Sequence, residues 1–132
     1  MKKYEFTGET KTVSFLFKDV TLHRIQAITS FASVVAGELG GWIEKEENLS
    51  HKGDAWVYSN AKVYGNAVVR GNAVVRENAE VRGNAEVRGN AEVYGNAVVR
   101  GKAVVRGKAE VREKAVVRGK AVELAKLQIL TD

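Results

Sequence analysis

Arginine and lysine are the residues of this 132-residue chain whose spacing points most directly to chemistry. Guanidinium and ammonium groups bind phosphates and other polyanions, and rows of them make such binding strongly dependent on salt. If one structural turn holds eighteen residues, the arginines form three rows: Arg82, Arg100 and Arg118; Arg70, Arg88 and Arg106; and Arg76 and Arg112. Lysine adds a further set near the C-terminus, made of Lys102, Lys108, Lys114 and Lys120.

Two interpretations of these rows stay open. Glutamates interleave with the arginines, so the rows could form a salt-bridged outer surface. The sharper interpretation is a polyanion-binding or nucleic-acid-binding face, although only three tyrosines of the repeat are available for base stacking. Residues 53–132 carry fourteen Lys or Arg and nine Asp or Glu, whereas residues 1–52 carry seven of each. The whole net charge of +5 therefore lies on the repeat, where it could also serve solubility alone.

Other reactive residues are scarce. His23 and His51 are the only histidines and could act as general bases, but we expect both to be structural or surface residues. Cysteine is absent, which excludes disulfides and thiol chemistry, and two histidines are too few for a three-histidine zinc site. The residues around Gly101 and Lys102 lack the spacing of a phosphate-binding loop. We predict no catalytic residue, no cofactor and no metal.

The charged rows depend on a six-residue repeat. Alanine recurs every six residues from Ala55 to Ala121, and valine stands two residues after each of the first eleven alanines. A helix would point successive alanines in different directions, whereas a strand turns alanine and valine inward and the residues between them outward. Gly-Asn follows in most hexads, and both residues tolerate the left-handed backbone angles of a corner. Each hexad therefore predicts one short side and one bend.

The number of sides per turn follows from the corner residues. Glycine is replaced at Ser59, Glu77 and Glu113, which share a column only if a turn holds eighteen residues. We therefore predict an all-β protein, a triangular, left-handed parallel β-helix of about four turns. Asparagine, from Asn60 to Asn96, should form hydrogen-bonded corner ladders. Lysine replaces it from Lys102 onward, and stacked lysines should repel unless something anionic lies nearby.

The remaining segments flank the coil. We assign residues 1–47 to an N-terminal β cap and residues 48–132 to the solenoid, because a repeat rod needs its end closed. Within the cap, residues 12–17 and 21–28 read as strands, with a turn at Lys18 and Asp19. We expect Trp42 and Trp56 to pack where cap and coil meet.

Apolar residues outside the core suggest self-association, either side to side or through the C-terminal end. The outward valines form rows that could be a subunit interface or ordinary strand formers. The C-terminal end has no cap-like segment and is apolar. The candidate oligomer surface consists of Val98, Val116, Val104, Val122, Leu124, Leu127, Ile129 and Leu130.

Three stretches of the sequence resemble a known group. Residues 4–7 (Tyr-Glu-Phe-Thr), 21–25 (Thr-Leu-His-Arg-Ile) and 40–43 (Gly-Gly-Trp-Ile) precede Gly-Asn-Ala-x-Val-Tyr repeats. In this the chain is similar to hexapeptide-repeat solenoid proteins of bacteria and prophages, some of which carry a putative transferase label. The resemblance implies a capped β-solenoid without an established activity. Its acyltransferase relatives use a histidine base near an inserted loop, and the unbroken frame of residues 53–130 leaves no room for such a loop.

We therefore expect a non-enzymatic structural or protein-interaction module, derived from a phage or prophage, that self-associates or binds a protein partner. A polyanion-binding module is the first alternative, and a degenerate acyltransferase relative is the second. The apolar runs are too short for a membrane span and the N-terminus lacks the core of a signal peptide. These features predict a cytoplasmic protein without membrane contact.

Overall fold

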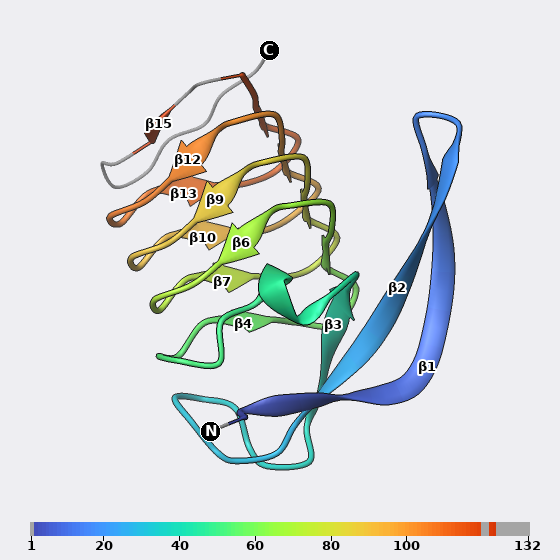
Figure 1. Ribbon diagram of the computed structural model, residues 1–132. Helices are drawn as coiled ribbons and strands as arrows, with labels where there is room; N and C mark the ends of the chain where they lie inside the picture. Colours follow the sequence, from blue (N-terminus) through green and yellow to red (C-terminus); the bar gives the residue numbers. More distant parts are fainter. Residues whose placement is uncertain (1, 120–121, 124–132) are drawn as a thin grey trace.

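The computed structural model describes residues 2–119 and 122–123, and from β4 (Trp56–Val57) onward they form a β-solenoid (Figure 1). An N-terminal hairpin and one further strand precede the coil, and a single 3-10 turn, η1 (Glu46–Asn48), follows them. The first three strands are β1 (Tyr4–Phe15), β2 (Lys18–Ala27) and β3 (Leu39–Ile43). The coil then consists of two-residue strands: β4 (Trp56–Val57), β5 (Lys62–Val63), β6 (Val68–Val69), β7 (Val74–Val75), β8 (Glu80–Val81), β9 (Glu86–Val87), β10 (Glu92–Val93), β11 (Val98–Val99), β12 (Val104–Val105), β13 (Glu110–Val111), β14 (Val116–Val117) and β15 (Val122–Glu123).

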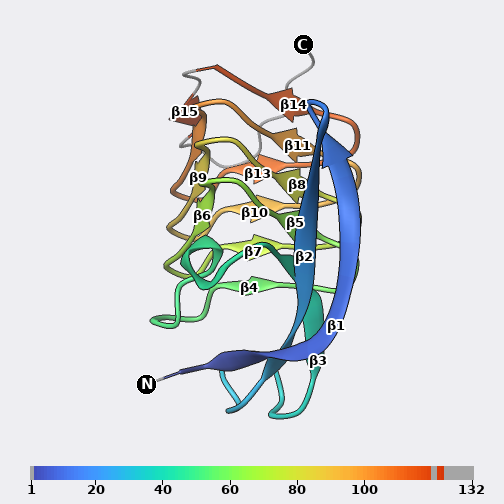
Figure 2. The same ribbon diagram turned by 45° about the vertical axis from the view of Figure 1, so that its right-hand side comes forward.

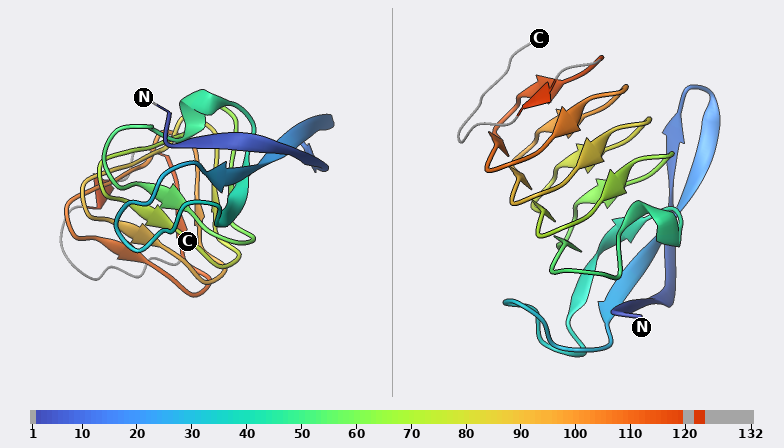
Figure 3. Two further views of the ribbon diagram at one scale, coloured as in Figure 1. Left: turned by 90° about the horizontal axis from the view of Figure 1, so that it is seen from below. Right: turned by 60° about the vertical axis from the view of Figure 1, so that its left-hand side comes forward.

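Each strand from β4 to β12 pairs in parallel with the strand three positions later in the chain. Trp56 lies opposite Val74, and Val98 opposite Val116, so the register advances by eighteen residues per turn. The three resulting sheets have the orders β3-β5-β8-β11-β14, β4-β7-β10-β13 and β6-β9-β12-β15 and form the three sides of the rod (Figures 1 and 3). The prediction of a three-sided parallel coil with eighteen residues per turn is confirmed, while its left hand stays a prediction.

From Ala55 to Val117 the inward positions of the coil hold only alanine and valine. Every alanine from Ala55 to Ala115 and every valine from Val57 to Val117 that was expected to face inward is buried. Because the narrow triangle has no space for larger groups, these two residue types fill it at each level. The outward residues between them are half-buried or exposed, with the exceptions of Trp56 and Tyr64, which the N-terminal segment covers.

The corners explain why glycine recurs. Gly89 has a φ of +70°, and a Cβ there would lie 2.8 Å from the backbone nitrogen of Gly107 in the next turn. Ser59, Glu77 and Glu113 adopt the same left-handed conformation, with φ values of 47°, 62° and 59°. Their common column confirms the argument that gave eighteen residues per turn. Side-chain amides connect successive corners, as predicted, from Asn66 to Asn84 and from Asn72 to Asn90.

The N-terminal hairpin continues one side of the coil. β2 pairs antiparallel with β3, and β3 pairs in parallel with β5, so β1, β2 and β3 extend the largest sheet to seven strands. The far half of the hairpin runs along the outside of that side (Figure 2). Because β3 belongs both to the N-terminal segment and to the coil's sheet, pairing in the coil begins before residue 48. The division at residues 47 and 48 stays a prediction.

The predicted turn at Lys18 and Asp19 is wrong. Leu16 and Phe17 form the turn instead, with φ values of 51° and 63°. A two-residue connection lets the strands pair without a gap from Phe15 opposite Lys18 to Thr10 opposite His23. Lys18 and Asp19 are thereby part of β2, and the Ser14 hydroxyl donates to Asp19 Oδ1 at 3.0 Å.

Both tryptophans lie at the junction, as expected, but on different sides of it. Trp42 packs with Leu22 and Tyr64 beneath the hairpin, where Lys11 Nζ is 4.3 Å from its ring centroid. Trp56 is fully buried in the main core, with its ring 5.3 Å from that of Phe31. The N-terminal segment therefore covers two faces of the first turns.

Candidate functional site

The predicted arginine rows exist as rows of the structure. Arg70, Arg88 and Arg106 each follow a strand of the β6-β9-β12 side, and the register of these strands places them one above another. Arg82, Arg100 and Arg118 follow β8, β11 and β14 in the same way. Arg76 and Arg112 lie on the third side, with Tyr94 between them. Their role in binding a partner stays a prediction.

The first turns of the coil neutralise their arginines. Arg70 Nε lies 2.9 Å from Glu86 Oε2, and Arg76 Nη2 lies 2.9 Å from Glu92 Oε1. Arg88 contacts the other oxygen of Glu86 at 3.1 Å, and Arg82 lies 3.6 Å from Glu80. The salt-bridged surface that the sequence left open as an alternative therefore describes this part of the rod.

The last described turn is different. Residues 53–99 carry five Lys or Arg and five Asp or Glu, whereas residues 100–119 carry seven Lys or Arg and two Asp or Glu. Since residues 120–132 carry two of each, the entire net charge of +5 lies on residues 100–119, which we call the basic turn. Within the described part of the chain, no ion pair involves Arg100, Arg106 or Arg112.

The two acidic residues of the basic turn do not change this picture. Glu110 accepts a hydrogen bond from the Tyr94 hydroxyl at 3.0 Å, and neither Glu110 nor Glu113 makes an ion pair among the described residues. The Nε atoms of Arg106 and Arg112 are buried and have no hydrogen-bond partner in the described residues, and the same holds for Nε of Arg82 and Arg88 in the earlier turns. A buried donor without an acceptor costs free energy, so an added acceptor here would be stabilising. Counting charge by turn rather than by half of the chain would have revealed this signal in the sequence.

The corner lysines border the same region. Lys102 and Lys108 are exposed and stand at the two ends of the side that carries β12, and Lys114 is exposed at the third corner. Val98 and Val116 are neighbours in one sheet and half-buried, as is Val104 on the next side. The strand of Val122 pairs with that of Val104. Lys120, Leu124, Leu127, Ile129 and Leu130 lie outside the described residues.

The histidines lie in the N-terminal segment and at the start of the coil. The His23 ring stacks on Phe6 at 4.5 Å, and the His51 ring stacks on Tyr4 at 4.1 Å. His51 Nδ1 accepts the backbone N–H of Lys3 at 3.0 Å, so Nε2 carries the proton that reaches Glu46 Oε1 at 2.8 Å. A general base needs a free nitrogen lone pair, and His51 has none in this arrangement. The hydrogen bond from His51 also lowers the pKa of Glu46.

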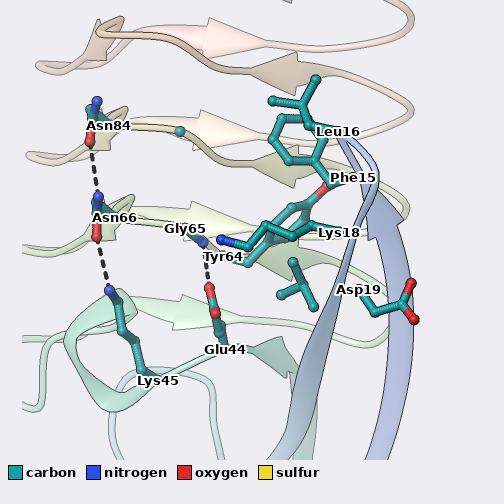
Figure 4. A pocket seen from close by; sticks show the side chains of 12 residues that line it. Phe15, Leu16, Lys18, Asp19, Glu44, Lys45, Tyr64, Gly65, Asn66 and Asn84 are labelled. Atoms are coloured by element: carbon teal, nitrogen blue, oxygen red, sulfur yellow. Dashed lines mark hydrogen bonds between the residues drawn. The ribbon is translucent and has the colours of Figure 1, made fainter.

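A cavity that the sequence did not predict lies between the hairpin tip and a corner of the coil (Figure 4). Its volume is about 410 Å³, and Phe15, Lys18, Glu44, Tyr64 and Asn84 are among the residues that line it. Most of its polar groups already have partners: Glu44 accepts the Gly65 N–H at 2.8 Å, and the Tyr64 hydroxyl reaches Glu80 at 3.1 Å. Nothing in the repeat indicated that a hairpin would fold back along one side.

The described residues contain no group of three or more His, Cys, Asp or Glu that could hold a metal ion. Among the same residues there is no helix long and apolar enough to cross a membrane.

Comparison with known proteins agrees with the coil. No protein-family model matches the chain. A stretch of 62 residues is 39% identical to the protein described as "Uncharacterized acetyltransferase YdcK" of Escherichia coli (strain K12). By its six-residue repeat and its three-sided parallel coil the chain is a hexapeptide-repeat β-solenoid. The similarity covers 44% of this chain and 19% of that relative, so it concerns about a fifth of the other protein's length.

Lys3 joins the N-terminal segment of the solenoid to the first turn. Its ammonium group donates to the carbonyl oxygens of Ala55 at 2.6 Å and Gly53 at 3.2 Å. Burial lowers the pKa of Lys3 from 10.5 to about 8, against the opposing attraction of Asp54. The charged form is therefore less favourable in the native state than in the unfolded chain.

This shift predicts an alkaline gain in stability. Between pH 8 and 10 the native state releases the Lys3 proton while the unfolded chain still holds it, so the free energy of unfolding should rise with pH. Lys3→Met should remove most of the rise, since only the smaller lowering of the Lys11 pKa remains, and Lys52→Met, at an exposed site, should keep it. Urea unfolding across this range measures the effect; an unchanged slope in Lys3→Met contradicts it. Above pH 10, Tyr64 opposes the gain, because burial raises its pKa to about 12.

Proposed function

We propose that this solenoid is a non-enzymatic interaction module that binds a polyanion through the basic turn. The observation that carries the proposal is the separation of charge along the rod. The first turns pair arginine with glutamate, whereas residues 100–119 hold the whole net charge of +5 and three arginines without an ion pair in the described chain. A surface that needed charge only for solubility would gain nothing from this concentration at one end.

The side of the rod that carries β12 offers the best-formed surface. Arg106 follows β12 at an outward position and lies between two exposed corner lysines, Lys102 and Lys108. Arg100 ends the preceding side and stands two residues before Lys102. The cations of such a surface would displace the counterions condensed on a nucleic acid, which supports affinity at low salt. The arginines and lysines would contact the phosphates of a nucleic acid rather than its bases, since residues 100–119 contain no aromatic residue on which a base could stack. We therefore expect little sequence preference.

The proposal predicts that arginines of the basic turn contribute more to oligonucleotide binding than arginines of the earlier turns. Arg100→Gln with Arg106→Gln should weaken binding of a DNA or RNA oligonucleotide by roughly tenfold and reduce the salt slope by about two. Arg70→Gln with Arg76→Gln is the matched control, because both arginines already pair with glutamates. Fluorescence anisotropy against salt concentration gives both quantities. No binding at low salt, or equal weakening by both pairs, would overturn the proposal.

Self-association is a second candidate. It is supported by the half-buried outward valines of one sheet, Val98 and Val116, which are adjacent in register and form an apolar strip beside the arginines. Such a strip on two copies could pack side to side. A polyanion-binding module and a self-associating rod are compatible, since the two valines lie on the side that carries β11 and β14, whereas Arg106 follows β12 on another side.

For self-association, light scattering over a wide concentration range should show a mass above that of one chain. Val116→Asp should lower the mass, whereas Val74→Asp, an outward valine of another side, should leave it unchanged. A single-chain mass at the highest concentration would contradict this candidate.

An acyl-group site is the third candidate and rests on the similarity to the relative described as an acetyltransferase. Calorimetric titration with acetyl-coenzyme A tests it, and the absence of heat would count against it. We further propose a cytoplasmic setting and a phage or prophage origin. The neighbouring genes in the source genome would test that origin.

A further inference from the structure

The two asparagine ladders have a fixed direction. In the first, Lys45 Nζ donates to Asn66 Oδ1 at 2.9 Å, and Asn66 Nδ2 donates to Asn84 Oδ1 at 3.3 Å. In the second, the backbone N–H of Asp54 reaches Asn72 Oδ1 at 3.3 Å, and Asn72 Nδ2 donates to Asn90 Oδ1 at 3.3 Å. An ammonium group and a backbone N–H can only donate. The base of each ladder therefore turns every amide oxygen toward the N-terminal end of the rod.

As a consequence, each ladder ends in a donor. Asn84 directs its Nδ2 away from Asn66, toward the following turn (Figure 4). The residues one turn above Asn84 and Asn90 are Lys102 and Lys108, where the repeat changes from asparagine to lysine. The turns are in close contact there, since the backbone N–H groups of Asn84 and Asn90 reach Gly101 O and Gly107 O at 2.7 Å. Lysine has no acceptor, so at both junctions N–H donors meet a cation.

We propose that each of these two junctions is a binding site for one oxyanion of the phosphate class. Its oxygens would accept from the asparagine Nδ2 and pair with the lysine ammonium, which supplies an acceptor that neither exposed group has among the described residues. Arg100 and Arg106 stand two residues before the lysines and have no ion pair in the described chain, so each junction has a second cation nearby. The inference rests on the proposed function and specifies where that surface holds individual phosphate groups.

The third corner of the triangle supplies an internal comparison. Lys114 follows Asn96 there by one turn, but Glu113 precedes it directly. Glu77 of the same column already accepts the Gly95 N–H at 3.0 Å. In the described residues no amide-to-amide bond connects Asn60, Asn78 and Asn96, so nothing fixes the direction of these amides. Because the Glu113 carboxylate would repel an anion and the Asn96 amide has no fixed direction, we expect no oxyanion site at this corner.

Titration with inorganic phosphate, replacing chloride at constant ionic strength, tests the inference by NMR of the asparagine side-chain amides. The Asn84 and Asn90 signals should shift and saturate, and the Asn96 signal should not. Lys102→Asn and Lys108→Asn continue the ladders and should each weaken phosphate binding at their own corner by about tenfold, the loss of one charged hydrogen bond. Lys114→Asn is the matched control and should change neither signal's response.

A second variant tests the same junction through stability. Asn84→Asp keeps the acceptor for Asn66 and places a carboxylate beneath Lys102. It should raise the melting temperature in chloride and abolish the phosphate response at that corner. Equal shifts of Asn96, or an unchanged response in Lys102→Asn, would overturn the inference. If oligonucleotide binding depends on Arg100 and Arg106 but no asparagine amide responds to phosphate, the proposed function stands and the two sites do not exist.

Discussion

The structure depends on one geometric constraint, the contact of each corner with the corner one turn later. A left-handed residue is needed at every bend, and the next turn's backbone comes within van der Waals reach of the position where a Cβ would stand. This contact fixes the spacing of the turns and holds the register at eighteen residues. The inward alanines and valines then stack without adjustment, and the outward side chains fall into straight rows. Each outward row of the surface therefore consists of residues that lie eighteen positions apart in the sequence.

Because the inward residues are uniform, function has to come from positions where the residue type changes along an outward row or a corner column. Two changes occur in the same turn. Glutamate becomes rarer among the outward residues, and lysine replaces asparagine at the corners. Neither change alters the interior, where alanine and valine continue through Val117. The rod can therefore vary its charge along its length at little cost to packing, and the observed variation places cations where the ladders end in donors.

Periodicity explains what the sequence could predict. The strands, the inward residues, the corner columns and the arginine rows all follow from the alternation and from Ser59, Glu77 and Glu113, and all are confirmed. The hairpin was harder to predict from the sequence, because Leu16 and Phe17 are unusual residues for a two-residue turn. Its packing over Trp42 and Tyr64 also involves contacts between residues distant in sequence. The direction of the hydrogen bonds in the asparagine ladders could not be predicted from the sequence either. It depends on Lys45 and on the Asp54 backbone N–H, whose positions only the folded N-terminal segment determines.

The seven-stranded sheet also has a consequence for how such a chain can change length. The hexad is the unit of the sequence, but the corner contacts and the ladders repeat only after a full circuit of the triangle. Duplication of one circuit would lengthen the rod and preserve every column. Duplication of one or two hexads would rotate all later residues onto a different side, so that arginines would stand above the wrong glutamates. Growth by whole circuits, starting from the side that the hairpin anchors, is therefore the natural way for this protein to gain or lose surface.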